Sequence, residues 1–191
     1  MNILILGGTG MIGSNLFIFL KQKKLNIFYT TRIRKDSYDN KSVIYFKPNN
    51  KNMDLKFLKK FKIIINAIGI TNKFNNNINN YSFFNTEFPY LINKYCYLNN
   101  LKFIHLSTNC VFNGKSKKSY KESDTTNADD IYGISKSLAD VNSINLLILR
   151  FSCIGIEFKN YHQLFNWFIK QKNYIKGYNK VMFNGITTIV L

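Results

Sequence analysis

Apolar residues along this chain fall into short continuous runs, and between the runs they recur at helical spacing. Continuous apolar runs are typical of buried strands in a parallel sheet, whereas helical spacing is typical of helices that cover such a sheet. The predicted strands are residues 2–6, 26–31, 43–46, 63–68, 102–106 and 146–151. The predicted helices are residues 11–24, 54–61, 82–99 and 130–142, with a further amphipathic helix over 161–171. This alternation favours an α/β fold with a Rossmann-type, doubly wound parallel sheet and helices on both faces.

A glycine cluster, Gly7-Gly8-Thr9-Gly10-Met11-Ile12-Gly13, lies between the first predicted strand and the first predicted helix. Gly7 and Gly8 permit a tight turn, Gly10 lets backbone approach a pyrophosphate, and Gly13 leaves room for the helix to pack. The N-terminal N–H groups of that helix would face the phosphates. A lone glycine motif is weak evidence, but the strand-to-helix position favours dinucleotide binding. The expected contacts are Gly7, Thr9, Gly10, Met11, Ile12 and Gly13.

The end of the second predicted strand bears on the choice of dinucleotide. A site for NAD usually has Asp or Glu there, which holds the ribose 2′-hydroxyl. Residues 1–35 contain no acidic residue, and Thr31, Arg32 and Arg34 stand in its place. Arg32 could pair with a 2′-phosphate, so we expect NADPH, with NADH as the other possibility. The alternative is a solvated basic loop.

The pattern also predicts how the chain is divided. We expect a dinucleotide-binding Rossmann domain over residues 1–155 and the start of a truncated substrate-binding lobe over 156–191, because the alternation stops after Arg150. Residues 186–191 resemble a strand cut off in mid-run, and the asparagine-rich residues 72–80 read as a solvated loop or a flap near the substrate.

The net charge of +17 raises the possibility of nucleic-acid binding. Only Arg32, Arg34 and Arg150 are arginines, however, and no basic cluster interleaved with aromatic residues stands out. We therefore expect no nucleic-acid partner. No segment is long and apolar enough for a membrane span, and no signal peptide is apparent.

Cysteine and histidine usage points to a protein without a metal site. The chain has three cysteines with no C-x-x-C pair, and only two histidines. This pattern offers no metal-ligand spacing and suits a reducing, cytoplasmic setting.

A second motif, Tyr132-Gly133-Ile134-Ser135-Lys136, places a phenol and an ammonium one helical turn apart. Reduction of a carbonyl needs a hydride donor and an acid for the oxygen. Tyr132 could be that acid, and a cation such as Lys136 would lower its pKa from the ordinary value of about 10. Ser107 and Thr108 end a predicted strand, where open α/β sheets bind ligands, and offer a hydroxyl to the substrate oxygen. By itself this spacing arises easily by chance in a chain rich in Tyr and Lys.

Together these motifs resemble the extended short-chain dehydrogenase/reductases, and within them the dTDP-4-dehydrorhamnose reductase family and related nucleotide-sugar 4-ketoreductases. The most specific stretch is Ser107-Thr108-Asn109-Cys110-Val111-Phe112-Asn113-Gly114, which resembles the ketoreductase branch rather than the epimerases. The likeness also rests on other segments, in the family's order: the glycine cluster, Asn66 to Gly69, Asn85 to Pro89, Tyr120 to Asp124, Tyr132 to Lys136, and Leu149-Arg150.

The resemblance implies roles for particular residues. Thr108, Tyr132 and Lys136 would be the catalytic residues, and Tyr132 and Lys136 would also contact the cofactor. Ala67, Ile68 and Gly69 would line the cofactor, while Thr108, Asn109, Cys110 and Tyr132 would face the substrate. Asn85 would lie beneath the active site or start a helix. The implied activity is NAD(P)H-dependent reduction of a nucleotide-linked 4-keto-6-deoxy sugar for cell-surface polysaccharide, with a homodimer as the candidate assembly.

Several residues depart from the family pattern, so other roles and other functions stay open. Asn109 and Cys110 stand where the family commonly has Asp and Tyr, and Cys153 stands near a position that tends to be tryptophan. Small buried apolar positions are the other reading of Cys110 and Cys153. His105 reads as a core or edge histidine. The alternative functions are an NAD-dependent epimerase or dehydratase of the same superfamily and a dinucleotide-binding protein without catalysis.

Overall fold

The computed structural model describes residues 1–37, 39–49, 53–71, 77–157, 163–179, 181, 183 and 185–191. Its centre is a six-stranded sheet in the order β3-β2-β1-β4-β5-β6, with every neighbouring pair parallel. The strands are β1 Asn2–Leu6, β2 Asn26–Thr31, β3 Val43–Tyr45, β4 Ile63–Asn66, β5 Lys102–Leu106 and β6 Leu146–Leu149. The six predicted strands are confirmed, with ends that differ by at most two residues. The strand order reverses next to β1, which is the point where such sheets bind ligands.

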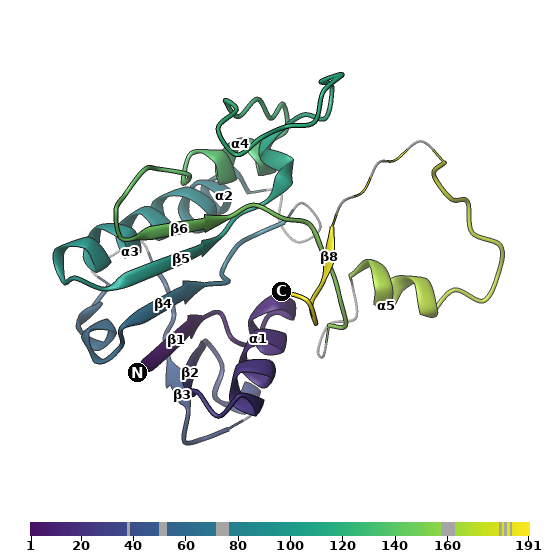
Figure 1. Cartoon of the computed structure of the whole chain (residues 1–191). Coiled ribbons are helices and arrows are strands. Elements are labelled where there is room, and N and C mark those ends of the chain that lie inside the picture. Colours follow the sequence, from purple (N-terminus) through teal and green to yellow (C-terminus); the bar gives the residue numbers. More distant parts are fainter. Residues whose placement is uncertain are drawn as a thin grey trace.

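Helices cover both faces of this sheet (Figure 1). Helix α1, Met11–Gln22, packs on one face, and the group formed by α2, η3 and α3 packs on the other. These three are α2 Ile78–Tyr81, the π-helix η3 Ser82–Glu87 and α3 Phe88–Leu98; the shorter elements are η1 Arg34–Asp36, η2 Lys56–Lys60, η4 Asn109–Val111 and α4 Ile131–Ser137. The Rossmann-type, doubly wound prediction is confirmed.

Two apolar clusters lie on the two faces because successive side chains of a strand point to opposite sides. Ile3 and Ile5 of β1 pack with Phe17 of α1, whereas Leu4 and Leu6 pack with α3 residues such as Phe88. Burial of β1 from both sides explains why its sequence is continuously apolar.

Several predicted helices differ from the structure. Residues 54–61 form only the short 3-10 helix η2, which Leu58 and the following Phe61 anchor in the core. The helix predicted over 82–99 begins earlier, at Ile78, and carries a π-helical segment. Part of the loop predicted over 72–80 is therefore helical, and residues 72–76 lie outside the described part. Helix α4 ends at Ser137 rather than near residue 142, since the chain continues in turns from Leu138.

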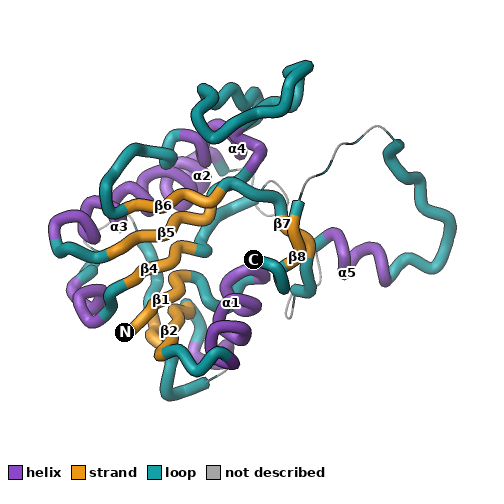
Figure 2. Tube along the Cα trace, in the orientation of Figure 1, coloured by secondary structure: helices purple, strands orange, loops and turns teal. Residues whose placement is uncertain are grey.

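The C-terminal part forms a small separate sheet and one short helix (Figures 1 and 2). Strand β7, Cys153–Ile154, pairs in parallel with β8, Ile186–Thr187. The predicted strand over 186–191 is thus shorter than expected, because Thr188 begins a turn. Helix α5, Leu164–Ile169, lies within the predicted 161–171, of which 161 and 162 are outside the described residues.

No helix in the described part of the chain is both long and apolar enough to cross a bilayer. Likewise, the described residues contain no group of three or more His, Cys, Asp or Glu side chains arranged to hold a metal ion.

Candidate active site

The glycine loop forms a tight turn that links β1 to α1. Gly7 has φ +81°, a left-handed backbone conformation that residues other than glycine rarely adopt. The backbone N–H of Gly7 donates to Thr30 Oγ1 at 2.9 Å, and the N–H of Gly8 donates to the Thr30 carbonyl at 3.1 Å. A Cβ at Gly13 would overlap the Gly7 carbonyl, whereas a Cβ at Gly10 would meet only Gly7 O, at 3.5 Å. Gly13 is therefore required for packing, and Gly10 faces open space.

A pocket of about 410 Å³ lies at the carboxyl ends of β1, β2 and β4. Many of the predicted cofactor residues line it: Gly7, Thr9, Gly10, Thr31, Arg32, Ala67, Ile68 and Gly69. Met11, Ile12, Gly13, Tyr132 and Lys136 are not part of its wall. Of these, Ile12 packs into the core between α1 and the sheet. The pocket matches the predicted place of a dinucleotide, at a helix N-terminus beside a topological switch point.

Sequence reasoning missed part of this pocket. Asp36, the first acidic residue of the chain, reaches the wall that also holds Arg32 because η1 turns the chain back after β2. Phe46, Pro48 and Phe84 add apolar surface suited to a base or ring. Asp36 follows the glycine cluster at close to the spacing expected for a ribose-binding acid, so its position was the available signal.

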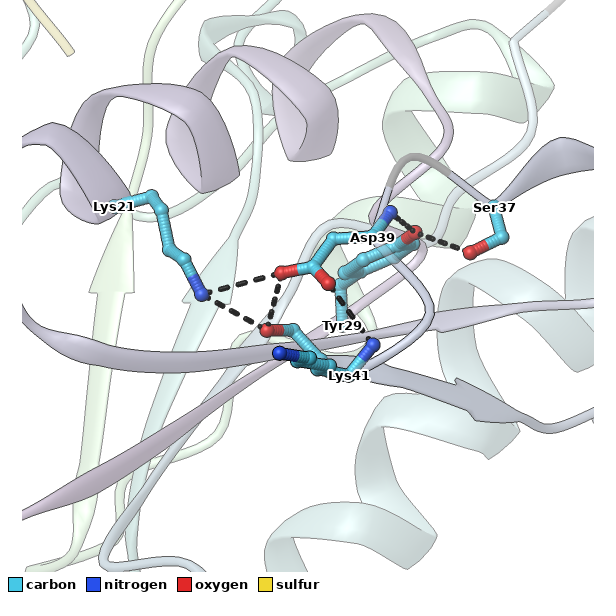
Figure 3. A network of polar contacts seen from close by, with 6 residues as sticks. Lys21, Tyr29, Ser37, Asp39 and Lys41 are labelled. Carbon is cyan, nitrogen blue, oxygen red and sulfur yellow. Dashed lines mark hydrogen bonds and ion pairs between the residues drawn. The ribbon is translucent and has the colours of Figure 1, made fainter.

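A polar network joins Ser37, Asp39 and Lys41, which lie between η1 and β3, to side chains of β2 and α1 (Figure 3). Tyr29, buried in β2, contacts Ser37 Oγ through its hydroxyl at 3.2 Å and accepts from the Asp39 N–H at 3.2 Å. Lys21 of α1 donates to Asp39 Oδ2 at 3.2 Å. The Lys41 N–H donates to Asp39 Oδ1 at 2.9 Å, and this bond is the main cause of a lowered Asp39 pKa. The network therefore braces the chain directly after Asp36.

The three predicted catalytic residues come from two segments that meet beyond the pocket. Thr108 follows β5 and accepts from the Cys110 N–H at 3.2 Å, and its hydroxyl favours the ionised Tyr132 phenol, which partly offsets the rise in the Tyr132 pKa. Tyr132 and Lys136 lie on α4, whose start is capped by Asp130 Oδ1, the acceptor for the Tyr132 and Gly133 N–H groups at 2.8 and 3.0 Å.

Lys136 connects this group to the pocket. Its Nζ is buried and donates to the Leu106 carbonyl at 3.2 Å. A Cβ on Gly69, which lines the pocket, would lie 2.8 Å from the same Nζ. The ammonium thus borders the glycine at the end of the pocket wall.

Burial dominates the electrostatics here. It lowers the pKa of Lys136 to about 8, which Asp140 partly opposes, and it raises the pKa of Tyr132 above its ordinary value. The expected lowering of the Tyr132 pKa by Lys136 is therefore wrong for this structure. The phenol keeps its proton at neutral pH, which is the form that an acid needs.

His105 lies on β5 beneath the same group. Its pKa falls to about 3 because burial, reinforced by Lys136, disfavours the charged ring. Asn66 Nδ2 lies 3.2 Å from His105 Nδ1, so the neutral ring accepts there. His105 Nε2 has no hydrogen-bond partner among the described residues. This burial fits the interpretation of His105 as a core residue.

The π-helix η3 braces α4 from below. Asn85, fully buried, accepts from the Ile70 N–H at 2.8 Å and donates to Ile70 O and Ser135 Oγ, each at 3.0 Å. Thr86 Oγ1 donates to Ser135 O at 2.6 Å. Asn85 lies inside a helix, so a helix-start role is wrong.

The predicted substrate side lies next to Thr108. Asn109 Oδ1 accepts from Ser152 Oγ at 2.5 Å, which ties η4 to the segment before β7. Cys110 is exposed and Cys153 half-buried, so a fully buried apolar role does not hold for Cys110.

The comparisons with known proteins agree with this fold. The family model described as "RmlD substrate binding domain" matches residues 1–175. No curated protein matches the chain at a significant level.

Solved structures with similar folds include nucleotide-sugar enzymes. A dTDP-4-dehydrorhamnose reductase from Clostridium acetobutylicum is 22% identical with a TM-score of 0.64, over 84% of this chain and 56% of that one. A hypothetical dTDP-4-dehydrorhamnose reductase from Sulfolobus tokodaii is 25% identical with a TM-score of 0.59, over 78% and 55%. A UDP-glucuronic acid 4-epimerase variant from Bacillus cereus, in complex with NAD and a fluorinated substrate analogue, is 21% identical with a TM-score of 0.71, over 87% and 61%.

The chain spans less than two thirds of the length of each of these structures. The family match covers most of the sequence and confirms the predicted resemblance. This chain belongs to the RmlD substrate-binding-domain family.

Proposed function

We propose that this chain is an NAD(P)H-dependent reductase of a nucleotide-linked 4-keto-6-deoxy sugar, similar to dTDP-4-dehydrorhamnose reductase. One observation carries the proposal: Lys136, which shares α4 with Tyr132, borders Gly69 at the end of the pocket wall. This arrangement brings a cation to the boundary of the pocket, one helical turn from a proton donor.

The residues present fit a nicotinamide dinucleotide. The open side of Gly10 and the start of α1 suit the pyrophosphate, and the wall near Arg32 and Asp36 suits the adenosine ribose. The pocket wall continues toward Lys136 through Ala67, Ile68 and Gly69. When bound, the nicotinamide supplies a hydride to the sugar carbonyl carbon.

Three side chains then act on the proton that the carbonyl oxygen receives. Tyr132, protonated at neutral pH, donates its hydroxyl proton to the carbonyl oxygen. Thr108, whose hydroxyl favours the ionised phenol, eases the loss of this proton. The phenolate that remains takes a proton back from water, while the Lys136 ammonium supplies a positive charge beside Gly69 at the end of the pocket.

The proposed cofactor preference is for NADPH, with NADH also accepted. Arg32 lines the pocket and can pair with a 2′-phosphate. Asp36 lies on the same wall and can accept a hydrogen bond from a 2′-hydroxyl, while repelling a phosphate. The two side chains therefore favour opposite cofactors.

The substrate side is proposed to include Thr108, Asn109, Cys110 and Tyr132. The exposed Cys110 beside Thr108 leaves room for a sugar that differs from that of the named reductases. The proposed setting is the cytoplasm, where free cysteines persist, and the proposed pathway is the synthesis of cell-surface polysaccharide sugars.

A second candidate is a 4-epimerase, supported by the structural similarity to the NAD-bound UDP-glucuronic acid 4-epimerase. An epimerase returns its hydride and so retains its nucleotide. Recovery of bound NAD from the purified protein would favour this candidate, whereas exchangeable NADPH favours the reductase.

The test is a fluorescence titration of the purified chain with NADPH, followed by addition of dTDP-4-keto-6-deoxyglucose. Binding with oxidation of NADPH is the expected result. If NADPH binds but neither this nor another nucleotide-linked keto sugar oxidises it, the proposed reductase activity is contradicted. That result would favour a dinucleotide-binding protein without catalysis. No binding of NADPH or NADH would contradict the dinucleotide site.

A further inference from the structure

A buried carboxylate lies one turn beyond Lys136. The Asp140 side chain is 2% exposed, and its Oδ2 accepts from Arg150 Nε at 2.7 Å. Asp140 Oδ1 is also buried and has no hydrogen-bond partner among the described residues. A carboxylate removed from water in this way needs a nearby positive charge, and one guanidinium N–H satisfies only one of its oxygens.

Backbone hydrogen bonds fix Asp140 relative to Lys136. The Ala139 N–H donates to Lys136 O at 3.2 Å, and the Asp140 N–H donates to Ser137 O at 3.1 Å. The chain therefore makes one more tight turn after α4. Asp140 acts on Lys136 electrostatically, and its charge favours the protonated form of the buried amine.

Arg150 anchors this carboxylate to the segment that follows Thr108. Its Nη1 donates to the Glu122 carbonyl at 3.1 Å, and its guanidinium lies 5.6 Å from the centre of the Phe112 ring. Phe112 is itself stacked on Tyr120, with ring centres 4.3 Å apart. Arg150 thus joins the turn after α4 to residues 112–122.

Other charged or titratable groups around Lys136 do not take the place of Asp140. His105, from β5, is neutral at physiological pH, and Tyr132, on the same helix, keeps its proton. Arg150 carries the same charge as the lysine. Among these groups only Asp140 supplies the negative charge that offsets the burial of the ammonium.

We propose that Asp140, held by Arg150, is a positioning residue that keeps the Lys136 ammonium charged where the Leu106 carbonyl holds it, at the end of the cofactor pocket. The inference rests on the proposed function, because it assumes that Lys136 contacts the bound nicotinamide ribose. It adds a buried ion pair, outside the group of Thr108, Tyr132 and Lys136, that sets the pH range over which the site works.

The experiment is the NADPH affinity of the complete 191-residue chain between pH 6.5 and 9.5, measured by fluorescence for wild type and Asp140→Asn. Wild-type affinity should fall as the pH rises through about 8, where Lys136 loses its proton. In Asp140→Asn the midpoint should move down by about one pH unit, which weakens binding at pH 7.5 roughly threefold. The matched control is Asp129→Asn, which removes the carboxylate of the exposed pair Lys115–Asp129 and should leave the midpoint unchanged.

The outcomes separate this inference from the proposed function. If wild type binds NADPH and Asp140→Asn shows the same pH midpoint, the role of Asp140 is overturned and the proposed function is not. Absence of NADPH binding by wild type at every pH would overturn both. If circular dichroism shows that Asp140→Asn does not fold, the double variant Asp140→Asn/Arg150→Met leaves neither charge unpaired and should show the same downward shift.

Discussion

The side chain of Asn85 satisfies both backbone polar groups of Ile70: the Ile70 N–H donates to Asn85 Oδ1 at 2.8 Å, and Asn85 Nδ2 donates to Ile70 O at 3.0 Å. The same Nδ2 reaches Ser135 Oγ at 3.0 Å. Asn85 therefore holds the segment after β4, which lines the pocket, against α4, which carries Tyr132 and Lys136. One amide fixes the relative position of the two halves of the proposed site.

Asn85→Ala should lower the free energy of unfolding by about 3 kcal/mol, because it removes two part-buried bonds to the Ile70 backbone and a buried bond to Ser135. Urea denaturation followed by circular dichroism measures this. The control is Asn99→Ala, which removes one hydrogen bond, to Tyr95 O, from a half-buried position and should cost about 1 kcal/mol. Equal losses in the two variants would contradict the bracing role of Asn85.

Gly10 and Gly13 should respond differently to the same added methyl group. Gly10→Ala should keep its stability within about 0.5 kcal/mol, since its φ of −76° suits alanine and its Cβ would point to open space. It should weaken NADPH binding at least about tenfold, because the methyl group occupies the expected pyrophosphate position. Gly13→Ala should lower stability by about 3 kcal/mol, because its Cβ overlaps backbone that cannot move aside.

Thermal denaturation and NADPH titration of both variants check these expectations. The control is Gly177→Ala, where no atom lies within 4 Å of the added Cβ. Unchanged NADPH affinity in Gly10→Ala would contradict the proposed course of the dinucleotide over the loop.

Arg32 and Asp36 should shift cofactor preference in opposite directions. Arg32→Ala should weaken NADPH about tenfold and NADH less than about twofold, because only NADPH carries the 2′-phosphate. Asp36→Asn should tighten NADPH relative to NADH, since it removes a repelling charge. The control is Arg34→Ala, because Arg34 stacks on Tyr45 at 4.7 Å and is not part of the pocket wall. An equal effect of Arg32→Ala on both cofactors would refute its role.

Much of this arrangement was predictable from the sequence, because continuous apolar runs such as that in β1 and a glycine loop before α1 each have one common structural use. The π-helix around Asn85 was not predictable, because its register depends on contacts with Ile70 and Ser135, far away in the chain. Asp36 escaped notice because η1 redirects the chain after β2, and short 3-10 turns leave little periodic signal. The direction of the Tyr132 pKa shift depends on burial, which residue spacing does not reveal.

His105 should make the protein less stable in mild acid. Its pKa in the folded chain, about 3, lies below the value near 6.5 expected after unfolding, so the unfolded chain binds more protons between these values. Stability from this group is complete above pH 6.5 and is lost as the pH falls toward 3. The loss between pH 7 and pH 5 should be about 2 kcal/mol.

Urea denaturation at both pH values, on wild type and His105→Gln, isolates this contribution, since glutamine does not titrate. The variant should lose about 2 kcal/mol less than wild type over the same range. An equal loss in both proteins would show that His105 is not kept neutral by burial.

Proton donation by Tyr132 in an NAD(P)H-dependent reduction is the central claim, and Tyr132→Phe tests it most directly. The measurement is the rate of NADPH oxidation with dTDP-4-keto-6-deoxyglucose, alongside the NADPH dissociation constant, in wild type and variant. We predict a rate lower by a factor of about 10² to 10⁴ with an almost unchanged dissociation constant, because the variant removes only the hydroxyl that donates the proton. A variant that oxidises NADPH as fast as wild type would contradict the assignment of Tyr132 as the acid.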